Sequence, residues 1–401
     1  MSKKILFLTT MYPGPLRKST IVCHSFVKEW QNMGYDVIVV HFRSIFPKIL
    51  YWGSQLFKKL AVRYIGNDNV ETDADKGTHV YRYDGALVYS IGIFKCIPHA
   101  PYSKRVINNK YNEVIKILEN NDFQPDYIIG HFYNPQLPII HRLKQKFTKA
   151  KTALILHEPN VSVVESIPNY KTYLKSIDVV GGRSESIRQD IMTKLNVDNT
   201  FVCHSGIPDR YLQPDNNIDF SHIHRFCFVG QLLPNKQPVT IIKALVNAYP
   251  DRDFDLTIIG KGPELKTIQE SCRTLSIEDK VHCLGYMSRD DVQQYLAKSQ
   301  VFVMVSLQEA FGLVYLEAMG KGCISIGTRN QGIDGVIKDG YNGFLAQGGD
   351  IEDLTRIFKH IRNMSVSEIE TISSNAKRTA LNFSDNKVAQ TYIDIVSKSN
   401  Q

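Results

Sequence analysis

The sequence predicts an α/β protein of two doubly wound parallel-sheet domains that face a central cleft. Short apolar segments rich in β-branched residues alternate with longer stretches of helical period, which is the pattern of βα units. These segments fall into two series, separated at 207–223 by a stretch rich in Pro, Asp and Asn. The length of 401 residues also suits two domains better than one core.

The first series predicts an N-terminal domain over residues 1–207. A helix is expected at 25–32, after the first strand. The last helix, within 384–401, has no strand partner of its own and is expected to pack back on this domain. The expected strands are 5–9, 36–41, 127–130, 153–156 and 179–181.

The second series predicts a C-terminal domain over residues 208–383. Helices are expected at 239–248 and 264–274, between strands. In such sheets ligands bind beyond the carboxyl ends of the strands, so the loops that follow strands are where function is sought. The expected strands are 225–229, 256–259, 281–284, 301–305 and 324–326.

Composition excludes several classes of protein. Hydrophobic residues make up 43% and charged residues 22%, which is globular and not disordered. No apolar stretch approaches the roughly 20 residues of a membrane span, and no signal peptide is expected. The seven cysteines form no CxxC pair, which disfavours a disulfide framework and fits a cytoplasmic protein.

The net charge of +8 is unevenly distributed. Residues 1–200 hold 27 Lys and Arg against 17 Asp and Glu, so the whole basic excess is N-terminal. Residues 43–64 add aromatic and aliphatic side chains between cations at roughly helical spacing. This segment predicts either peripheral contact with an anionic membrane or an amphipathic helix packed on its own domain. Nucleic-acid binding is not expected, because no base-reading module accompanies the charge.

The most informative segment is 306–322, which follows an expected strand. It places Glu309 in a loop, opens a helix near Gly312 and carries Glu317 about one turn into that helix. A helix start offers backbone N–H groups and a positive dipole end, which suit a diphosphate. Carboxylates on either side can accept hydrogen bonds from the diols of a ribose and a sugar. The alternative is a solvated loop residue and a surface helix residue.

Several motifs together resemble the nucleotide-sugar site of family 4 retaining glycosyltransferases, group 1, with the GT-B fold of two Rossmann-like domains. The resemblance covers most of the chain and is strongest over 225–350. Its fold assigns acceptor binding to the N-terminal domain and nucleotide-sugar binding to the C-terminal domain. The segments that carry the resemblance are 306–345, 228–236, 258–264, 284–286, 125–132 and 156–157.

The resemblance implies a role for each matching residue. Glu317 would hold the ribose hydroxyls, Glu309 the donor sugar, and Lys236 the leaving diphosphate. Such a point charge, aimed where negative charge develops, is the electrostatic contribution that usually dominates group transfer. The implied donor-side residues are Gly14, Gly230, Gln231, Lys236, Gly260, Gly285, Tyr286, Met287, Glu309, Ala310, Phe311, Gly312, Leu313 and Glu317.

Three further residues are candidates in the N-terminal domain. His131 follows the strand 127–130, and the resemblance makes it a third catalytic residue beside Glu309 and Lys236. A satisfied structural histidine is the alternative. His157 and Asn160 are weaker candidates for the acceptor side, with plain loop structure as the alternative.

The implied activity is transfer of a sugar from a nucleoside-diphosphate-sugar to an acceptor hydroxyl with retention (EC 2.4.1.-), without a cofactor or a metal. Glycan assembly for the cell envelope, capsule or exopolysaccharide, on a glycan or lipid-linked acceptor at the cytoplasmic membrane face, is expected. Gln231 stands where relatives have Arg, and Ala310 where they usually have Gly. These departures keep two alternatives open: a scaffold subunit of weak activity, and another GT-B enzyme such as a sugar-nucleotide epimerase.

Overall fold

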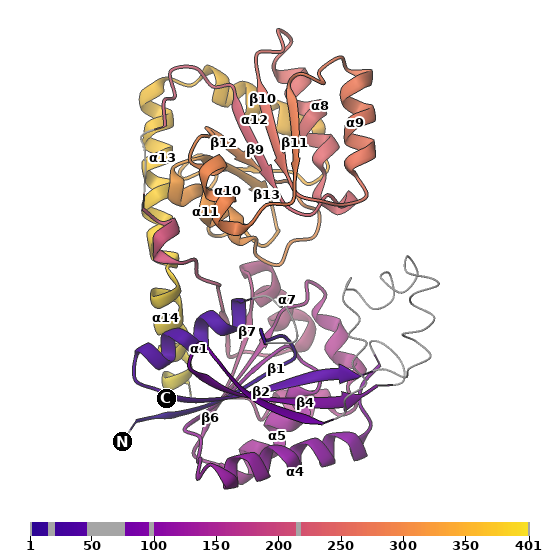
Figure 1. Cartoon of the computed structure of the whole chain (residues 1–401), viewed down its shortest axis with the longest axis vertical. Helices are drawn as coiled ribbons and strands as arrows, with labels where there is room; N and C mark the ends of the chain where they lie inside the picture. The colour runs from indigo at the N-terminus through magenta and orange to yellow at the C-terminus, as the bar shows by residue number, and fades with distance from the viewer. Residues whose placement is uncertain (1, 15–20, 46–76, 96–99, 214–217, 400–401) are drawn as a thin grey trace. The chain divides into compact units, whose positions relative to one another are not determined.

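The computed structural model describes residues 2–14, 21–45, 77–95, 100–213 and 218–399. Two compact units divide the chain (Figure 1). Unit 1 comprises Met1–Gly182, Arg188–Cys203 and Ala389–Gln401, and unit 2 comprises Arg183–Ile187 and His204–Val388. The expected division lay at 207/208 and at 383/384, and the expected first domain included the short segment that groups with unit 2.

Unit 1 is built on an eight-stranded sheet in the order β3-β4-β2-β1-β5-β6-β7-β8. All neighbours are parallel except β3 and β4, which form an antiparallel pair at one edge. The chain moves outward from β1 in both directions, so the sheet is doubly wound. The strands are β1 (Lys4–Thr9), β2 (Asp36–Ile45), β3 (Thr78–Tyr83), β4 (Ala86–Phe94), β5 (Tyr127–His131), β6 (Lys151–Leu156), β7 (Val179–Gly182) and β8 (Thr200–Val202).

Helices cover both faces of this sheet, because right-handed crossovers on either side of β1 place them oppositely. Figure 1 shows α1 on one side of the strands and α4 and α5 on the other. The central strands are buried on both faces, which explains their nearly continuous apolar sequences. The helices are α1 (Val22–Asn32), α4 (Lys104–Asn120), α5 (Gln136–Lys146), α6 (Tyr170–Leu174) and α7 (Glu185–Leu195), with the 3-10 helix η1 (Val161–Ser166).

The C-terminal helix α14 (Asp385–Lys398) returns to unit 1 from residue 389 onward. Trp30 of α1 is fully buried, and its indole N–H donates to the carbonyl of Ala389 at 3.0 Å. Its ring also meets that of Tyr392 with centroids 5.3 Å apart. An aromatic anchor with a satisfied N–H therefore holds this helix.

Unit 2 contains a six-stranded parallel sheet in the order β11-β10-β9-β12-β13-β14. The order reverses between β9 and β12, which is the switch point where such sheets bind ligands. Its core is one continuous cluster of buried side chains from strands and helices. The strands are β9 (Arg225–Val229), β10 (Asp255–Ile259), β11 (Val281–Gly285), β12 (Val301–Val303), β13 (Ile324–Thr328) and β14 (Phe344–Ala346).

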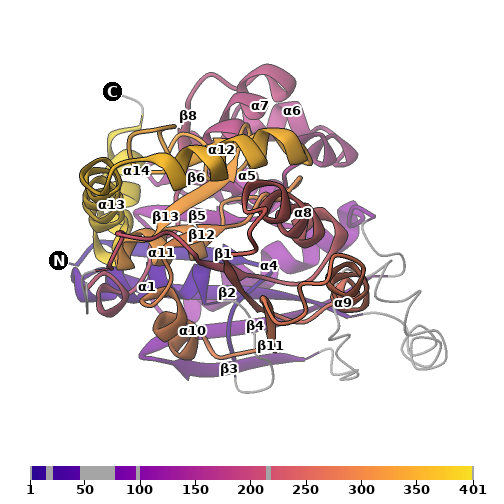
Figure 2. The same cartoon turned by 90° about the horizontal axis from the view of Figure 1, so that it is seen from above.

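The helices of unit 2 begin at recognisable caps. Asp350 caps α12 by accepting from the backbone N–H groups of Glu352 and Asp353, and Ser365 with Glu368 forms a capping box on α13. Helix α12 lies beside α8 (Figure 2). The helices are α8 (Pro238–Ala248), α9 (Leu265–Thr274), α10 (Arg289–Leu296), α11 (Leu313–Lys321), α12 (Ile351–Asn363) and α13 (Val366–Ala380), with 3-10 helices η2 (Asp209–Tyr211), η3 (Pro234–Lys236) and η4 (Leu381–Phe383).

The prediction of two doubly wound α/β domains is confirmed, and every expected strand is present within a few residues of its expected bounds. The β3–β4 hairpin, β8 and β14 were not among the elements expected from the sequence. Among the described residues, no helix is long and apolar enough to cross a membrane.

Candidate functional site

The loops that follow β9, β10, β11 and β12 carry the expected donor-side residues of unit 2. Because all these strands run parallel, their carboxyl ends meet at one edge of the sheet. The loop after β12 is joined to η3, after β9, by a hydrogen bond from the N–H of Leu307 to the carbonyl of Asn235 at 2.8 Å. Two segments separated by some seventy positions are thus fixed beside each other.

Lys236 and Glu309 form an ion pair at this edge. The Nζ atom of Lys236 lies 2.5 Å from Oε2 of Glu309, and the two side chains are only 16% and 15% exposed. The N–H of Glu309 donates to Oε1 of Gln331 at 3.1 Å, and its carbonyl accepts from the N–H of Gly332 at 2.9 Å. The loop therefore holds this carboxylate in place, and Gln331 is a partner that the sequence analysis missed.

The start of α11 is shaped by Gly312, the residue before the helix. Its φ is +82°, and a Cβ at this position would lie 2.7 Å from the ring of Tyr315, so only glycine fits. No side chain caps α11, as far as the described residues show. The first backbone N–H groups of the helix are the donors that an anion would use here.

Glu317 lies one turn into α11 and is 4% exposed. Nε of Arg289 donates to its Oε1 at 2.7 Å, and the amide of Gln293 donates to its Oε2 at 2.6 Å. Burial nevertheless raises the pKa of Glu317, against the opposing effect of the Arg289 charge. The surface-residue alternative for Glu317 is therefore wrong, since the carboxylate is almost fully buried and paired.

Arg289 and Gln293 were not among the site residues expected from the sequence. They stand four residues apart on α10, so both point from the same face of that helix. Nη2 of Arg289 and Oε1 of Gln293 are buried and have no hydrogen-bond partner among the described residues. The i, i+4 spacing was a visible signal, but nothing in the sequence indicated that this face meets Glu317.

The glycines at the ends of β10 and β11 lie in different surroundings. A Cβ on Gly260 would lie 1.8 Å from the carbonyl oxygen of Gly230, so the two loops approach too closely for any side chain at residue 260. Gly285 ends β11, and Tyr286 after it is 73% exposed. Tyr286 and the partly buried Met287 thus present a ring and a thioether at the edge of the unit.

The two departures from the family pattern also lie at this edge. Gln231 follows Gly230 and is exposed, whereas Ala310 is partly buried between Glu309 and Phe311. A Cβ on Gly332 would lie 2.5 Å from the carbonyl carbon of Ala310, so the backbone here is tightly packed. Phe311 is buried and meets the ring of His204 at 5.2 Å.

His131 ends β5 in unit 1 and is fully buried. Its Nδ1 lies 2.9 Å from Nε2 of His157, and its Nε2 lies 3.2 Å from the hydroxyl of Tyr392. His157 stacks on Phe132 with ring centroids 4.1 Å apart. The structure thus joins the two histidines that the sequence analysis treated separately, and it adds Tyr392 from α14.

Two other candidates of unit 1 have local structural roles. The side chain of Asn160 accepts a hydrogen bond from the N–H of Ser162 and so caps η1. Gly14 lies after β1, where a Cβ would be 2.7 Å from the hydroxyl of Tyr81. Of the segment 43–64, Arg43–Ile45 form the end of β2, and the rest lies outside the described residues.

Residues 222–379 match the family model described as glycosyl transferases group 1, and this segment belongs to that family. The match covers β9 to α13, which includes Lys236, Glu309 and Glu317. The recognition made from the sequence motifs is therefore confirmed.

Curated relatives extend the similarity. The chain is 30% identical over 244 residues to N-acetyl-alpha-D-glucosaminyl L-malate synthase of Bacillus anthracis, covering 56% of this chain and 62% of that protein. It is 28% identical over 182 residues to UDP-Gal:alpha-D-GlcNAc-diphosphoundecaprenol alpha-1,3-galactosyltransferase of Escherichia coli, covering 43% and 46%. The chain thus matches only part of the length of either relative.

Among solved structures, the fold is similar to that of Anabaena HepE in complex with UDP and glucose. The TM-score is 0.64 at 18% identity, and the comparison covers 98% of this chain and 99% of that chain. This likeness establishes the GT-B fold that the sequence predicted.

Proposed function

We propose that the chain is a retaining glycosyltransferase, of the hexosyltransferase type, that moves a sugar from a nucleoside-diphosphate-sugar to an acceptor hydroxyl. The observation that carries this proposal is the arrangement of Lys236, Glu309 and the start of α11 at one edge of unit 2. A cation, a carboxylate and an uncapped helix start are together suited to a sugar linked to a diphosphate.

Lys236 supplies the positive charge for the leaving diphosphate. Its ammonium group is paired with Glu309, so it is held in place before any donor binds. When the bond between the sugar and the diphosphate breaks, negative charge grows on the phosphate oxygen, and a fixed cation there lowers the barrier. We propose that this charge, with the N–H groups of α11, makes a metal unnecessary for transfer.

Glu317 and its partners form the ribose side of the proposed site. A ribose hydroxyl both donates and accepts, so it can give its proton to the carboxylate and accept from a guanidinium. The buried Nη2 of Arg289 and Oε1 of Gln293 lack hydrogen-bond partners among the described residues. Ribose hydroxyl groups could accept from the first atom and donate to the second.

The test is to incubate the purified chain with labelled UDP-, GDP- and ADP-sugars and to follow release of the nucleoside diphosphate. Slow hydrolysis or transfer of one donor is expected. Lys236→Met should lower the rate by about 100- to 1000-fold, the usual effect of removing one group that stabilises developing charge. Lys298→Met is the matched control, because this exposed lysine precedes β12 and so lies at the opposite edge of the sheet, and it should leave the rate unchanged.

Other outcomes would replace the proposal. Binding of a donor without release of nucleoside diphosphate would indicate a scaffold subunit, the alternative raised by Gln231 and Ala310. An altered sugar on an intact nucleotide would indicate an epimerase. Equal rates in the Lys236→Met and Lys298→Met variants would remove Lys236 from the mechanism.

We further propose a glycan or lipid-linked acceptor in envelope or exopolysaccharide assembly. The support is the activity of the Escherichia coli relative, a galactosyltransferase whose acceptor is alpha-D-GlcNAc-diphosphoundecaprenol, and the basic excess of residues 1–200. A cytoplasmic location and peripheral contact with an anionic membrane belong to the same proposal. Flotation of the chain with liposomes containing anionic lipid is expected, and its absence at low salt would contradict the contact.

A further inference from the structure

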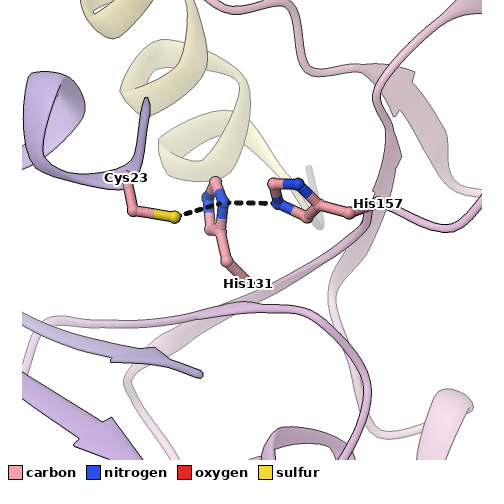
Figure 3. A group of neighbouring side chains, drawn as sticks. All are labelled: Cys23, His131 and His157. Carbon is pink, nitrogen blue, oxygen red and sulfur yellow. Dashed lines mark hydrogen bonds between the residues drawn. The ribbon is translucent and has the colours of Figure 1, made fainter. Parts of the chain in front are cut away.

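Three side chains of unit 1 form a compact group of nitrogen and sulfur atoms. Cys23 comes from α1, His131 from the end of β5 and His157 from the residue after β6 (Figure 3). One atom from each, the thiol sulfur and two ring nitrogens, all lie within 4.8 Å of one another. Cys23 is 1% exposed and His131 is fully buried, whereas His157 is partly exposed, which leaves a route to the group from outside.

From this geometry we infer that Cys23, His131 and His157 form a binding site for a thiophilic divalent metal ion such as Zn²⁺. Zinc bonds of about 2.3 Å to sulfur and about 2.05 Å to nitrogen imply tetrahedral edges of about 3.3 Å for N···N and about 3.5 Å for N···S. The corresponding separations are 2.9 Å between Nδ1 of His131 and Nε2 of His157, and 3.7 Å between Nδ1 of His131 and Sγ of Cys23. Shifts of a few tenths of an ångström on these two edges, with a closer approach of Sγ of Cys23 to Nε2 of His157, which lie within 4.8 Å of each other, would accommodate the ion.

The surroundings of the group resemble the outer shell of metal sites. A metal-bound histidine usually gives its other ring N–H to a polar partner, which fixes its tautomer. Nε2 of His131 faces the hydroxyl of Tyr392 at 3.2 Å, and Nδ1 is the ring nitrogen that faces Cys23 and His157. The hydroxyl of Thr9 lies 3.7 Å from Sγ of Cys23, within reach of a hydrogen bond to sulfur.

Apolar rings enclose the other sides. The ring of Phe7 lies 5.0 Å from that of His131, and the ring of Phe26 lies 5.6 Å from it. A low-dielectric shell strengthens the attraction between a thiolate and a divalent cation. The three ligand atoms also need little ordering on binding, because strand ends and a helix already hold them.

The ligand set selects the kind of metal. One thiolate and two imidazoles suit Zn²⁺ or Co²⁺, whereas Mg²⁺ and Mn²⁺ prefer oxygen ligands. On binding, the Cys23 thiol loses its proton to solvent, and each imidazole keeps one proton on its other nitrogen. Three protein ligands leave the fourth tetrahedral position to water. Its three ligands belong to unit 1, whereas the proposed diphosphate site belongs to unit 2, and an ion on His131 would withdraw that ring from any role in transfer.

The test uses the full chain, freed of metal with a chelator and then titrated with Co²⁺. One equivalent is expected to bind with the absorption of a thiolate-to-cobalt charge transfer. Zn²⁺ should then displace it, with release of one proton relative to the metal-free chain. Cys23→Ser should abolish the charge-transfer band, and His157→Gln should weaken Zn²⁺ binding at least tenfold, as loss of a ligand does.

Cys283→Ser and His282→Gln in β11 are matched controls, since both residues belong to unit 2 and neither is part of the group, and they should leave binding unchanged. Circular dichroism of each variant shows whether it is folded. In addition, Zn²⁺ should raise the melting temperature of the wild-type chain and not that of Cys23→Ser. The absence of stoichiometric binding by the wild-type chain, or equal binding in the Cys23→Ser and His157→Gln variants, would overturn the inference.

Discussion

The two units hold the polar side chains at their strand ends in opposite ways. In unit 2 the groups are charged and paired across elements, Lys236 with Glu309 at 2.5 Å and Arg289 with Glu317 at 2.7 Å. In unit 1 the group around His131 consists of two imidazole rings, a hydroxyl and a thiol. The first arrangement suits a polyanionic donor, and the second suits a soft cation or a proton.

The difference shows that net charge is a poor guide to where an anionic substrate binds. The basic excess lies entirely in residues 1–200, yet the candidate diphosphate site lies in the less basic part of the chain. A single cation held by a partner carboxylate at an uncapped helix start is better placed than many mobile ones. Charge spread over a surface attracts ligands, whereas a fixed charge binds a particular group.

The largest expected effect concerns the aromatic anchor of unit 1. Trp30→Ala should reduce the free energy of unfolding by about 3–5 kcal/mol, because a fully buried indole and its hydrogen bond to Ala389 are both lost. Urea unfolding measures this. Phe94→Ala, at an aromatic that is 41% exposed in the same unit, is the control and should change stability by less than about 1 kcal/mol. Similar values for both would show that α14 is held by other contacts.

The sequence predicted the secondary-structure elements and the positions of the motifs, but it did not predict which side chains contact one another. Buried parallel strands produce apolar runs such as 5–9 and 324–328, so the fold could be predicted without coordinates. Glu309 and Glu317 could be found because their spacing around Gly312 is local. The contacts of Glu317 with Arg289, and of His131 with Tyr392, join residues 28 and 261 positions apart, and no periodicity carries that information.

The second prediction concerns the affinity of unit 2 for the nucleotide donor and tests the role of Glu317. Glu317→Gln keeps the shape of the side chain and removes its charge, leaving the buried guanidinium of Arg289 without its anion. Affinity for the nucleotide donor should fall about 10- to 100-fold, as expected for losing charged hydrogen bonds worth about 1.5–3 kcal/mol.

Isothermal titration calorimetry with the donor that the wild-type chain hydrolyses measures this change. Glu270→Gln on the exposed face of α9 is the matched control and should bind the donor as the wild-type chain does. Unchanged affinity in the Glu317→Gln variant would contradict the ribose assignment.

An effect of similar size concerns His204 in unit 2, which lies against Phe311 and Phe383. Burial lowers the pKa of His204 to about 4. Between pH 6.5 and about 4 the unfolded chain therefore binds a proton that the folded chain does not, so stability falls as the pH is lowered through this window.

The loss should reach about 2–3 kcal/mol at the lower end of that window, from the size of the shift. Urea unfolding at several pH values measures it, and the difference between the wild-type chain and His204→Gln isolates this residue from the carboxylates. Identical pH dependence in both would mean that His204 is not buried as a neutral ring.

The central claim is that unit 2 holds the nucleotide-sugar through the loops after β9, β11 and β12 and the start of α11. Hydrogen–deuterium exchange, measured with and without the donor that the wild-type chain hydrolyses, tests it most directly. We expect slower exchange in peptides covering 230–236, 285–289 and 309–317, and a much weaker effect in the Glu317→Gln variant. Protection confined to other segments, with these peptides unchanged at saturating donor, would contradict the account.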